Sequence, residues 1–226
     1  MINELKKILS RVDADYADIR YEVKKETVIG FSGKELSRVN VSSGDGYVLR
    51  VLRDGGFSST TFTRPEDAGR AVELGVGNAM LLSKTARRPA SLAKTPPVKA
   101  EFHPVIEEHP ASVSLEEKIA LTRAYNDIPM GNARVATGTI TYSEICRDKF
   151  FASTEGSEIR EDLATVSVAG FCAAKDGLLS QSAFFLIGGS DGMARLRGRE
   201  DYFEENTARL VDMLSAAPAA GGVCDV

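Results

Sequence analysis

Residues 156–185 read G-S-E-I-R-E-D-L-A-T-V-S-V-A-G-F-C-A-A-K-D-G-L-L-S-Q-S-A-F-F, and this stretch decides the fold. A long run that leans apolar leads to Lys175-Asp176-Gly177, and a second apolar run follows. An Asp-Gly pair between two strand-like runs supplies the positive φ angles that a tight hairpin requires. The stretch therefore predicts two long antiparallel strands that reverse at Lys175-Asp176-Gly177.

Residues 33–62 carry a second copy of this pattern, G-K-E-L-S-R-V-N-V-S-S-G-D-G-Y-V-L-R-V-L-R-D-G-G-F-S-S-T-T-F. Asp54-Gly55 corresponds to Asp176-Gly177, and Phe62 corresponds to Phe184 at the same spacing. Two copies of one hairpin unit predict an α+β fold that is built from duplicated modules. Each module is an antiparallel meander with flanking helices.

Apolar periodicity predicts the remaining elements of the first module. Ile2, Leu5, Leu9 and Val12 recur at helical spacing. Strict polar and apolar alternation over residues 18–24 predicts a strand with one buried and one solvated face. Further short strands are expected at 28–31, 36–41, 47–52 and 57–62, with turns at Gly33, at Gly44-Asp45-Gly46 and at Asp54-Gly55-Gly56.

Two capping boxes predict helix starts. Thr63-Arg64-Pro65-Glu66 precedes a helix with a buried stripe of small residues that runs from Ala68 to Leu82, and Ser114-Leu115-Glu116-Glu117 precedes a helix to about Tyr125. The second meander is expected over 134–188, with longer strands than the first. A last amphipathic helix follows from about Glu200.

The chain divides on this basis into consecutive parts. Most of its eight prolines fall between residues 84 and 112, which is typical of an extended connector. The expected parts are a first α+β module at 1–84, a connector at 85–113, a second module at 114–217, and residues 218–226 as the start of a further, catalytic half. Residues 223–226 resemble the beginning of a strand.

The composition excludes some function classes. The 226 residues carry a formal charge of −4, which argues against a broad phosphate-binding surface, and the basic spots at Arg87-Arg88 and 195–199 are short. No apolar run approaches the roughly 18–20 residues that span a bilayer. The chain has three cysteines, an odd number, at wide spacings, and its start does not resemble a leader peptide. These features predict a reducing, cytoplasmic setting.

The residues that could carry chemistry do not form a complete site. His103 and His109, even with Glu107 or Glu108, have a poor spacing for zinc, and Pro104 and Pro110 prevent the helix that would align two ligands. We therefore expect both histidines in an exposed linker.

Nucleophilic and acid–base chemistry has equally little support. Cys146 and Cys172 lie in strand-like segments, where a buried structural thiol is expected, and the role of Cys224 stays open. Glu116-Glu117 and Glu204-Glu205 are expected on solvated helix faces.

The loop Gly188-Gly189-Ser190-Asp191-Gly192 is the remaining candidate site. Its position before a helix would suit an anion, but the acidic first turn of that helix opposes one. A flexible turn is the favoured interpretation, and contact with a peptide backbone through Gly188 and Gly189 is the functional alternative.

The order and spacing of several short motifs resemble the TldD/PmbA family, which is also called modulator of DNA gyrase or peptidase family U62. The later motifs look like the TldD branch. The motifs are Tyr16-Ala17-Asp18-Ile19-Arg20-Tyr21-Glu22, Gly44-Asp45-Gly46 before Val48-Leu49-Arg50-Val51, Gly56-Phe57-Ser58-Ser59, Ser114-Leu115-Glu116-Glu117-Lys118, Ser153-Thr154-Glu155-Gly156, and Gly188-Gly189.

This resemblance implies a cytoplasmic, zinc-dependent peptidase that works as a homodimer or as a heterodimer with a paralogue and takes extended or unfolded peptides. The family's metal motif, H-E-x-x-x-H with a later cysteine, follows a stretch similar to 221–226, so no catalytic or metal residue is assigned here. The chain is then expected to be an N-terminal half that holds the partner and shapes the peptide channel, with Gly188 and Gly189 as channel candidates.

Two alternatives stay open. One is a non-catalytic partner or binding module of the PmbA type, without a metal. The other is an association with DNA or gyrase, which the family's older name suggests and the acidic composition disfavours.

Overall fold

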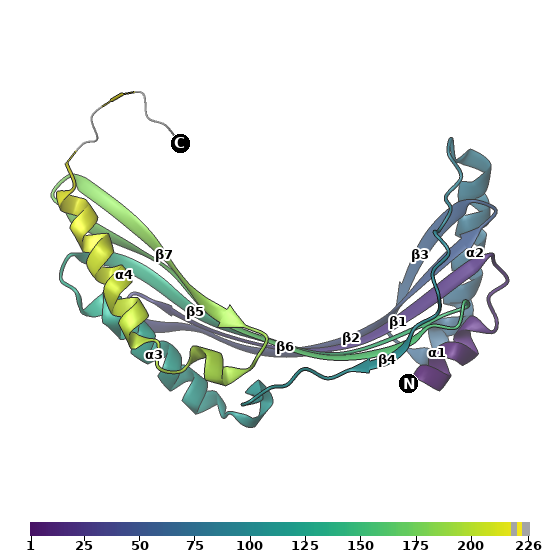
Figure 1. Cartoon of the computed structure of the whole chain (residues 1–226), viewed down its shortest axis with the longest axis horizontal. Helices are drawn as coiled ribbons and strands as arrows, with labels where there is room; N and C mark the ends of the chain where they lie inside the picture. Colours follow the sequence, from purple (N-terminus) through teal and green to yellow (C-terminus); the bar gives the residue numbers. More distant parts are fainter. Residues whose placement is uncertain (218–220, 223–226) are drawn as a thin grey trace. The chain divides into compact units, whose positions relative to one another are not determined.

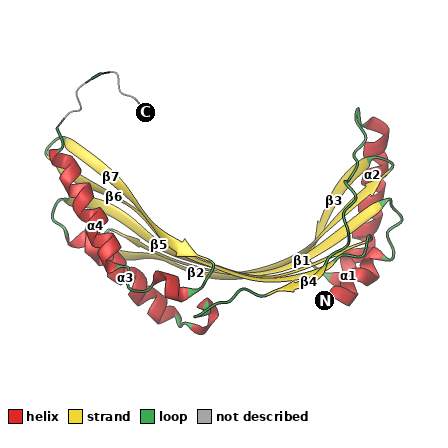
Figure 2. Cartoon of the chain, in the orientation of Figure 1, coloured by secondary structure: helices red, strands yellow, loops and turns green. Residues whose placement is uncertain are grey.

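The computed structural model describes residues 1–217 and 221–222. Its helices and strands appear in Figures 1 and 2. In chain order they are α1 (Ile2–Leu9), β1 (Tyr16–Ser32), β2 (Glu35–Arg53), β3 (Gly56–Phe62), η1 (Pro65–Asp67), α2 (Ala68–Thr85), β4 (Lys99–Phe102), η2 (Pro110–Ser112), α3 (Leu115–Gly131), β5 (Val135–Ser153), β6 (Glu158–Asp176), β7 (Leu179–Gly189), η3 (Met193–Leu196), α4 (Glu200–Asp212) and η4 (Met213–Ser215).

The element order confirms an α+β fold with a repeated module. A helix, three strands, a short 3-10 turn and a second helix follow one another from α1 to α2, and the same order recurs from α3 to α4. The sheet order is β3-β2-β1-β5-β6-β4, and β7 also pairs with β6. The first strands of the two repeats, β1 and β5, are therefore neighbours in one sheet.

Both predicted hairpins form, although the second turn is displaced by one residue. Arg53 pairs with Gly56, so Asp54 and Gly55 form a two-residue loop, and their φ angles are 50° and 78°. In the second hairpin Asp176 is still paired, with Leu179. The loop residues are Gly177, with φ of 56°, and Leu178, because Gly177 meets the need for a positive φ at the first loop position.

The strands of the first repeat are longer than predicted. Gly44-Asp45-Gly46 was expected to form a turn, yet these residues lie inside β2, which has 19 residues like β5 and β6. The expected break between residues 24 and 28 is also absent, since β1 runs through it. Neither Gly44 nor Gly46 has a positive φ. Glycine permits a turn but does not impose one when both flanking segments pair in a sheet.

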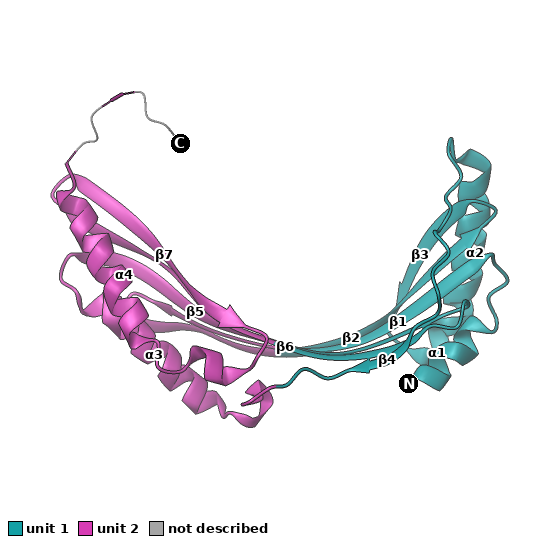
Figure 3. Cartoon of the chain, viewed as in Figure 1, with its two compact units in different colours: residues 1–25, 42–105, 145–164 teal, residues 26–41, 106–144, 165–226 magenta. Residues whose placement is uncertain are grey.

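The chain forms two compact units (Figure 3). Unit 1 comprises residues 1–25, 42–105 and 145–164, and unit 2 comprises 26–41, 106–144 and 165–226. The long strands β1, β2, β5 and β6 contribute residues to both. The compact units therefore interleave along the chain, whereas the predicted modules are consecutive.

In unit 1, α1 and α2 pack on one face of the sheet. Their apolar side chains surround Ile19, Leu49 and Val51, which are fully buried. The small residues of α2 allow close packing, as predicted: the Ser58 hydroxyl donates to the Gly75 carbonyl at 2.6 Å. Leu82 is an exception to the predicted stripe, because 45% of it is exposed.

In unit 2, α3 and α4 cover one face of the sheet (Figure 1). Tyr125 of α3 stacks on Phe203 of α4 with ring centroids 4.6 Å apart, and Phe203 also stacks on Phe185 of β7 at 5.5 Å. Leu210 and Leu214 extend this core. The predicted amphipathic stripe of the last helix is thus confirmed, since Phe203, Thr207 and Leu210 are buried.

Of the two predicted capping boxes, only the second has a side-chain cap, and the carboxylate of Glu117 in that box bonds Arg197. The Ser114 hydroxyl accepts a hydrogen bond from the Glu117 N–H at 3.1 Å. At the other box, a 3-10 turn at Pro65–Asp67 precedes α2, and no side chain caps it. Pro65 at the start of this turn has no N–H, and the turn shifts the helix start to Ala68, away from Thr63.

The connector between the repeats is mostly extended. It forms β4, which pairs in parallel with the beginning of β6 from Lys99↔Glu158 to Phe102↔Glu161. The expected strand at 223–226 and residues 218–220 lie outside the described residues. None of the helices in the described part of the chain is long and apolar enough to cross a membrane.

Candidate functional site

The outer edge of β7 is the most distinctive surface of unit 2. β7 pairs with β6 from Asp176↔Leu179 to Val166↔Gly189, and no other strand within residues 1–217 pairs with it. Its side chains alternate. Phe185 is buried under α4, whereas Phe184 and Leu186 are 63% and 56% exposed. Solvent-exposed apolar side chains therefore lie beside an unpaired strand edge.

A third apolar residue completes this surface. Phe171 of β6 lies directly opposite Phe184 and is 47% exposed. We call Phe171, Phe184 and Leu186 the apolar patch. It lies on the sheet face opposite the one that α4 covers, because Phe185 alternates with its members. An exposed apolar surface beside an unpaired edge is typical of a site for a partner or a peptide.

Hydrogen bonding shows which main-chain groups of β7 are available. The Leu186 N–H donates to the Tyr202 hydroxyl of α4 at 3.1 Å, so it points away from β6. N–H and C=O groups of alternate residues in a strand point to the same side. Ser182 and Phe184 therefore also direct their main-chain groups outward, and Tyr202 covers the edge at Leu186.

The predicted channel residues Gly188 and Gly189 form the last two positions of β7, beyond the apolar patch. A Cβ atom on Gly188 would lie 2.6 Å from the Val166 carbonyl oxygen, so only glycine permits this close pairing. At Gly189 a Cβ atom would lie 2.7 Å from Asp191 Oδ1, an atom that can move away. Gly188 thus fixes the end of the β6–β7 pair.

Side-chain and main-chain hydrogen bonds connect the loop after Gly189 to neighbouring residues. Arg195 forms a bidentate ion pair with Asp191, through Nε at 3.0 Å and Nη2 at 2.7 Å. This contact lowers the pKa of the Asp191 carboxyl. Gly192 pairs with Glu108, whose carbonyl accepts the Met193 N–H at 2.9 Å. The contacts with Glu108 join distant parts of the sequence, so the loop residues alone could not indicate them.

Arg197 ties the end of the connector to α3. Its guanidinium bonds Glu108 at 2.6 and 2.7 Å and Glu117 at 2.6 Å. The contact lowers the pKa of Glu108 and raises that of Arg197. Arg195 and Arg197 are thus both engaged by carboxylates. Glu116, Glu117, Glu204 and Glu205 are exposed on their helices, as predicted.

The histidines do not form a metal site. His103 is exposed and lies 3.3 Å from Glu101, and His109 is half-buried, with Nδ1 accepting the Ala111 N–H at 3.1 Å. No group of three or more His, Cys, Asp or Glu side chains within residues 1–217 could hold a metal ion. The donor set of a metallopeptidase is therefore not found in the described part of this chain.

Of the two cysteines that we expected to be buried, only Cys172 is fully buried. Cys172 is buried and free, and burial raises the pKa of its thiol to about 11, so the reactive thiolate does not form near neutral pH. Cys146 is half-buried and not disulfide-bonded. Cys224 lies outside the described residues.

Sequence reasoning missed a buried polar cluster in unit 2. Lys118 of α3 and Glu144 of β5 form an ion pair at 2.6 Å, and only 5% and 7% of these residues is exposed. The Thr27 and Tyr142 hydroxyls also donate to Glu144. The sequence contains one indication of this cluster. Glu144 falls on the same inward-facing side of the strand as Ile140 and Tyr142, so a charged residue occupies a core position.

Comparisons with known proteins agree with this fold. Residues 17–79 match the family model described as PmbA/TldA metallopeptidase domain 1, and residues 108–215 match the PmbA/TldA metallopeptidase central domain. A metalloprotease of Synechocystis sp. is 25% identical over 210 residues, which are 92% of this chain and 45% of that protein. A metalloprotease of Methanothermobacter thermautotrophicus is 26% identical over 217 residues, or 94% and 46%.

Solved structures share the fold. A protein of Bacteroides thetaiotaomicron described as a modulator of DNA gyrase has a TM-score of 0.76 at 14% identity, over 94% of this chain and 49% of that one. TldE from Thermococcus kodakarensis has a TM-score of 0.66 at 14% identity, over 93% and 46%. The chain spans about half the length of these relatives. The two domain matches together cover most of its residues, and the chain belongs to the PmbA/TldD metallopeptidase family.

Proposed function

We propose that this chain is the peptide-holding scaffold of a cytoplasmic, zinc-dependent peptidase that acts on extended or unfolded peptides. Family membership supports the peptidase class. The proposal places the zinc ligands in the part of the relatives' length that this chain does not span, and it assigns no catalytic step to the described residues. The working enzyme pairs this protein with a second copy or with a paralogue.

The single observation that supports peptide holding is the open edge of β7 beside the apolar patch. An extended peptide can add to such an edge through main-chain hydrogen bonds, which do not depend on side-chain identity. Alternate side chains of the peptide would then lie beside Phe184 and Leu186 of β7. A folded protein offers neither free main-chain groups nor exposed apolar side chains in this register, so the site selects unfolded segments.

The outer edge of β3 is a weaker candidate. β3 is shorter, and the outward residues Phe57, Ser59 and Thr61 include two hydroxyl side chains. Phe57 is 36% exposed and lies under the guanidinium of Arg50. This edge therefore offers less apolar surface to a peptide than β7 does.

The test measures binding of a fluorescent, extended apolar peptide by anisotropy. Replacing Phe184 with Ser removes the centre of the apolar patch, and we expect roughly tenfold weaker binding, because burial of a phenylalanine contributes about 1.5–3 kcal/mol. Phe57→Ser on β3 is the matched control and should leave the affinity unchanged. A peptide that is N-methylated at alternate residues should not bind. Equal binding of the methylated peptide would overturn main-chain pairing at this edge.

The second candidate is a non-catalytic partner of the PmbA type, which the matches to the PmbA/TldA domain models equally allow. This protein would bind peptides at β7 and rely on a paralogue for hydrolysis. Zinc analysis of the protein isolated in its natural assembly separates the two functions. Stoichiometric zinc in the polypeptide that contains residues 1–226 supports the peptidase, and zinc that is confined to the other polypeptide supports the partner.

A further inference from the structure

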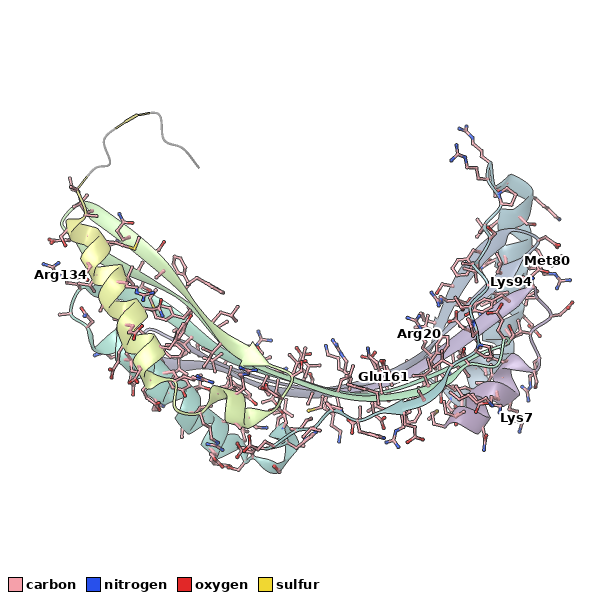
Figure 4. The ribbon with its side chains drawn as sticks, viewed as in Figure 1. Lys7, Arg20, Met80, Lys94, Arg134 and Glu161 are labelled. Atoms are coloured by element: carbon pink, nitrogen blue, oxygen red, sulfur yellow. The ribbon has the colours of Figure 1, made fainter. Side chains whose placement is uncertain are left out.

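Unit 1 contains a cavity of about 350 Å³ on the sheet face opposite its helices. The lining comes from three adjacent strands: β1 gives Arg20 and Glu22, β5 gives Lys149 and Phe151, and β6 gives Ile159 and Glu161. Strand alternation places these residues on the helix-free face, because Ile19 of β1 packs against α1 and α2. Figure 4 labels Arg20 and Glu161 in this part of the sheet.

The charges in the cavity are not balanced by one another. Glu22 is paired with Arg147 at 3.3 Å. The Arg20 guanidinium lies over the Phe151 ring at 5.6 Å, which orients it without neutralising it. Lys149 and Glu161 are half-buried and have no ion-pair partner among residues 1–217. Two cations and one carboxylate thus surround an apolar floor of Phe151 and Ile159.

We propose that this cavity binds a zwitterion, namely a short peptide with free termini and an apolar side chain. The α-carboxylate binds Arg20 and Lys149, since a guanidinium forms paired, charge-assisted hydrogen bonds with a carboxylate. The α-ammonium binds Glu161, and the apolar side chain covers Phe151 and Ile159. The volume lies at the lower end of the range for ligand pockets and suits a dipeptide.

The charge pattern disfavours other ligands. An inorganic anion would meet Glu161 and would leave the aromatic floor uncovered. A divalent cation would meet Arg20 and Lys149. Hydrolysis of peptide bonds is the class of reaction that supplies new free termini. The choice of a peptide as the ligand therefore rests on the proposed function. The preference for a zwitterion rests on the charges of the cavity alone. The site would then hold a product of proteolysis, in a different unit from the β7 edge.

The test uses calorimetric titration of the full chain with the dipeptide Leu-Phe. Acetyl-Leu-Phe-amide lacks both charges, and we expect it to bind at least tenfold more weakly. Arg20→Gln and Glu161→Gln should each weaken Leu-Phe binding at least tenfold. The matched control is Lys7→Gln, on the exposed side of α1 (Figure 4), and it should have no effect. Free phenylalanine and inorganic phosphate serve as further ligands.

Each outcome decides the proposal. Tight binding of the capped dipeptide, or of phosphate as strongly as Leu-Phe, would overturn it, as would unchanged affinity in both Arg20→Gln and Glu161→Gln. Free phenylalanine that binds as well as Leu-Phe supports the zwitterion and narrows the ligand to an amino acid. Thermal unfolding confirms that each variant is folded. If the long peptide binds at β7 and Leu-Phe does not bind at all, only the cavity proposal fails.

Discussion

Lys118 Nζ and Glu144 Oε2 lie 2.6 Å apart, and both side chains are buried between α3 and the sheet. The Thr27 hydroxyl donates to the other carboxylate oxygen of Glu144 at 3.1 Å. A buried ion pair contributes little net stability compared with apolar residues, but loss of one partner leaves an uncompensated charge. Removal of either side chain alone should therefore disturb the packing of α3 on β5.

The first prediction follows from this ion pair. Glu144→Gln should lower the free energy of unfolding by about 3–5 kcal/mol, because Lys118 keeps its charge without a counter-charge. The double variant Lys118→Met with Glu144→Leu should recover part of this loss, because no charge is left unpaired, although the Thr27 and Tyr142 hydroxyls lose their acceptor. Urea denaturation measures both. A double variant that is less stable than Glu144→Gln would show that the pair contributes net stability.

A second prediction concerns the contact of β3 with α2. A Cβ atom on Gly56 would lie 1.9 Å from the Ala79 carbonyl oxygen, so Gly56→Ala must push the helix away and should cost about 1–3 kcal/mol or more. Gly77 in the same helix is exposed and has open space around it. Gly77→Ala should therefore stabilise the protein by up to about 1 kcal/mol, because alanine is the better helix former. Thermal unfolding measures both changes. If both substitutions stabilise the protein, or both destabilise it, this packing is contradicted.

The third prediction compares the two capping boxes. Ser114→Ala removes the hydroxyl that accepts the Glu117 N–H, and it should cost about 1 kcal/mol. Thr63→Ala should change the free energy of unfolding by less than about 0.5 kcal/mol, because no side chain caps the turn after it. Denaturant titration of the two variants side by side is the measurement. Equal losses would mean that Thr63 also caps a helix.

The fourth prediction concerns pH. Arg197 lowers the pKa of Glu108 below its ordinary 4.5, so the ion pair stabilises the folded chain above that pH, and this contribution is lost as the pH falls through the lowered value. The stability difference between the wild type and Glu108→Gln should be full at neutral pH and should shrink below about pH 4.5. Glu107→Gln is the control, since Glu107 is exposed. Carboxylates titrate within roughly pH 3 to 7. A stability difference between the wild type and Glu108→Gln that stays constant over this range would contradict the pairing.

The fifth prediction concerns the buried thiol. Burial raises the pKa of Cys172 to about 11, and none of its surface is exposed. Cys172 should therefore resist alkylation by iodoacetamide at pH 8 in the folded chain and should react after denaturation in urea, as judged by mass spectrometry of its peptide. Cys172→Ser should retain the fold but lose stability, because a hydroxyl would replace an apolar contact in the core.

The sequence by itself determined the repeat and the types of its elements. Asp54-Gly55 and Gly177 mark two hairpins because the positive φ that they allow is a local property. Amphipathic spacing located α1 and α4 for a similar reason, since one helix face must be apolar wherever it packs. The family resemblance also needed only the order of short motifs, and the two domain matches confirm it.

The tertiary structure decided what depends on distant neighbours. Gly44-Asp45-Gly46 stays extended because the segments before and after it lie in one strand of the sheet. Glu144 is buried because Lys118 of another element pairs with it. The cavity beside Arg20 likewise arises only when β1 lies next to β5 and β6, which are distant in the sequence. Local sequence fixes backbone preferences, whereas long-range pairing determines which of those preferences is used and which side chains share a surface.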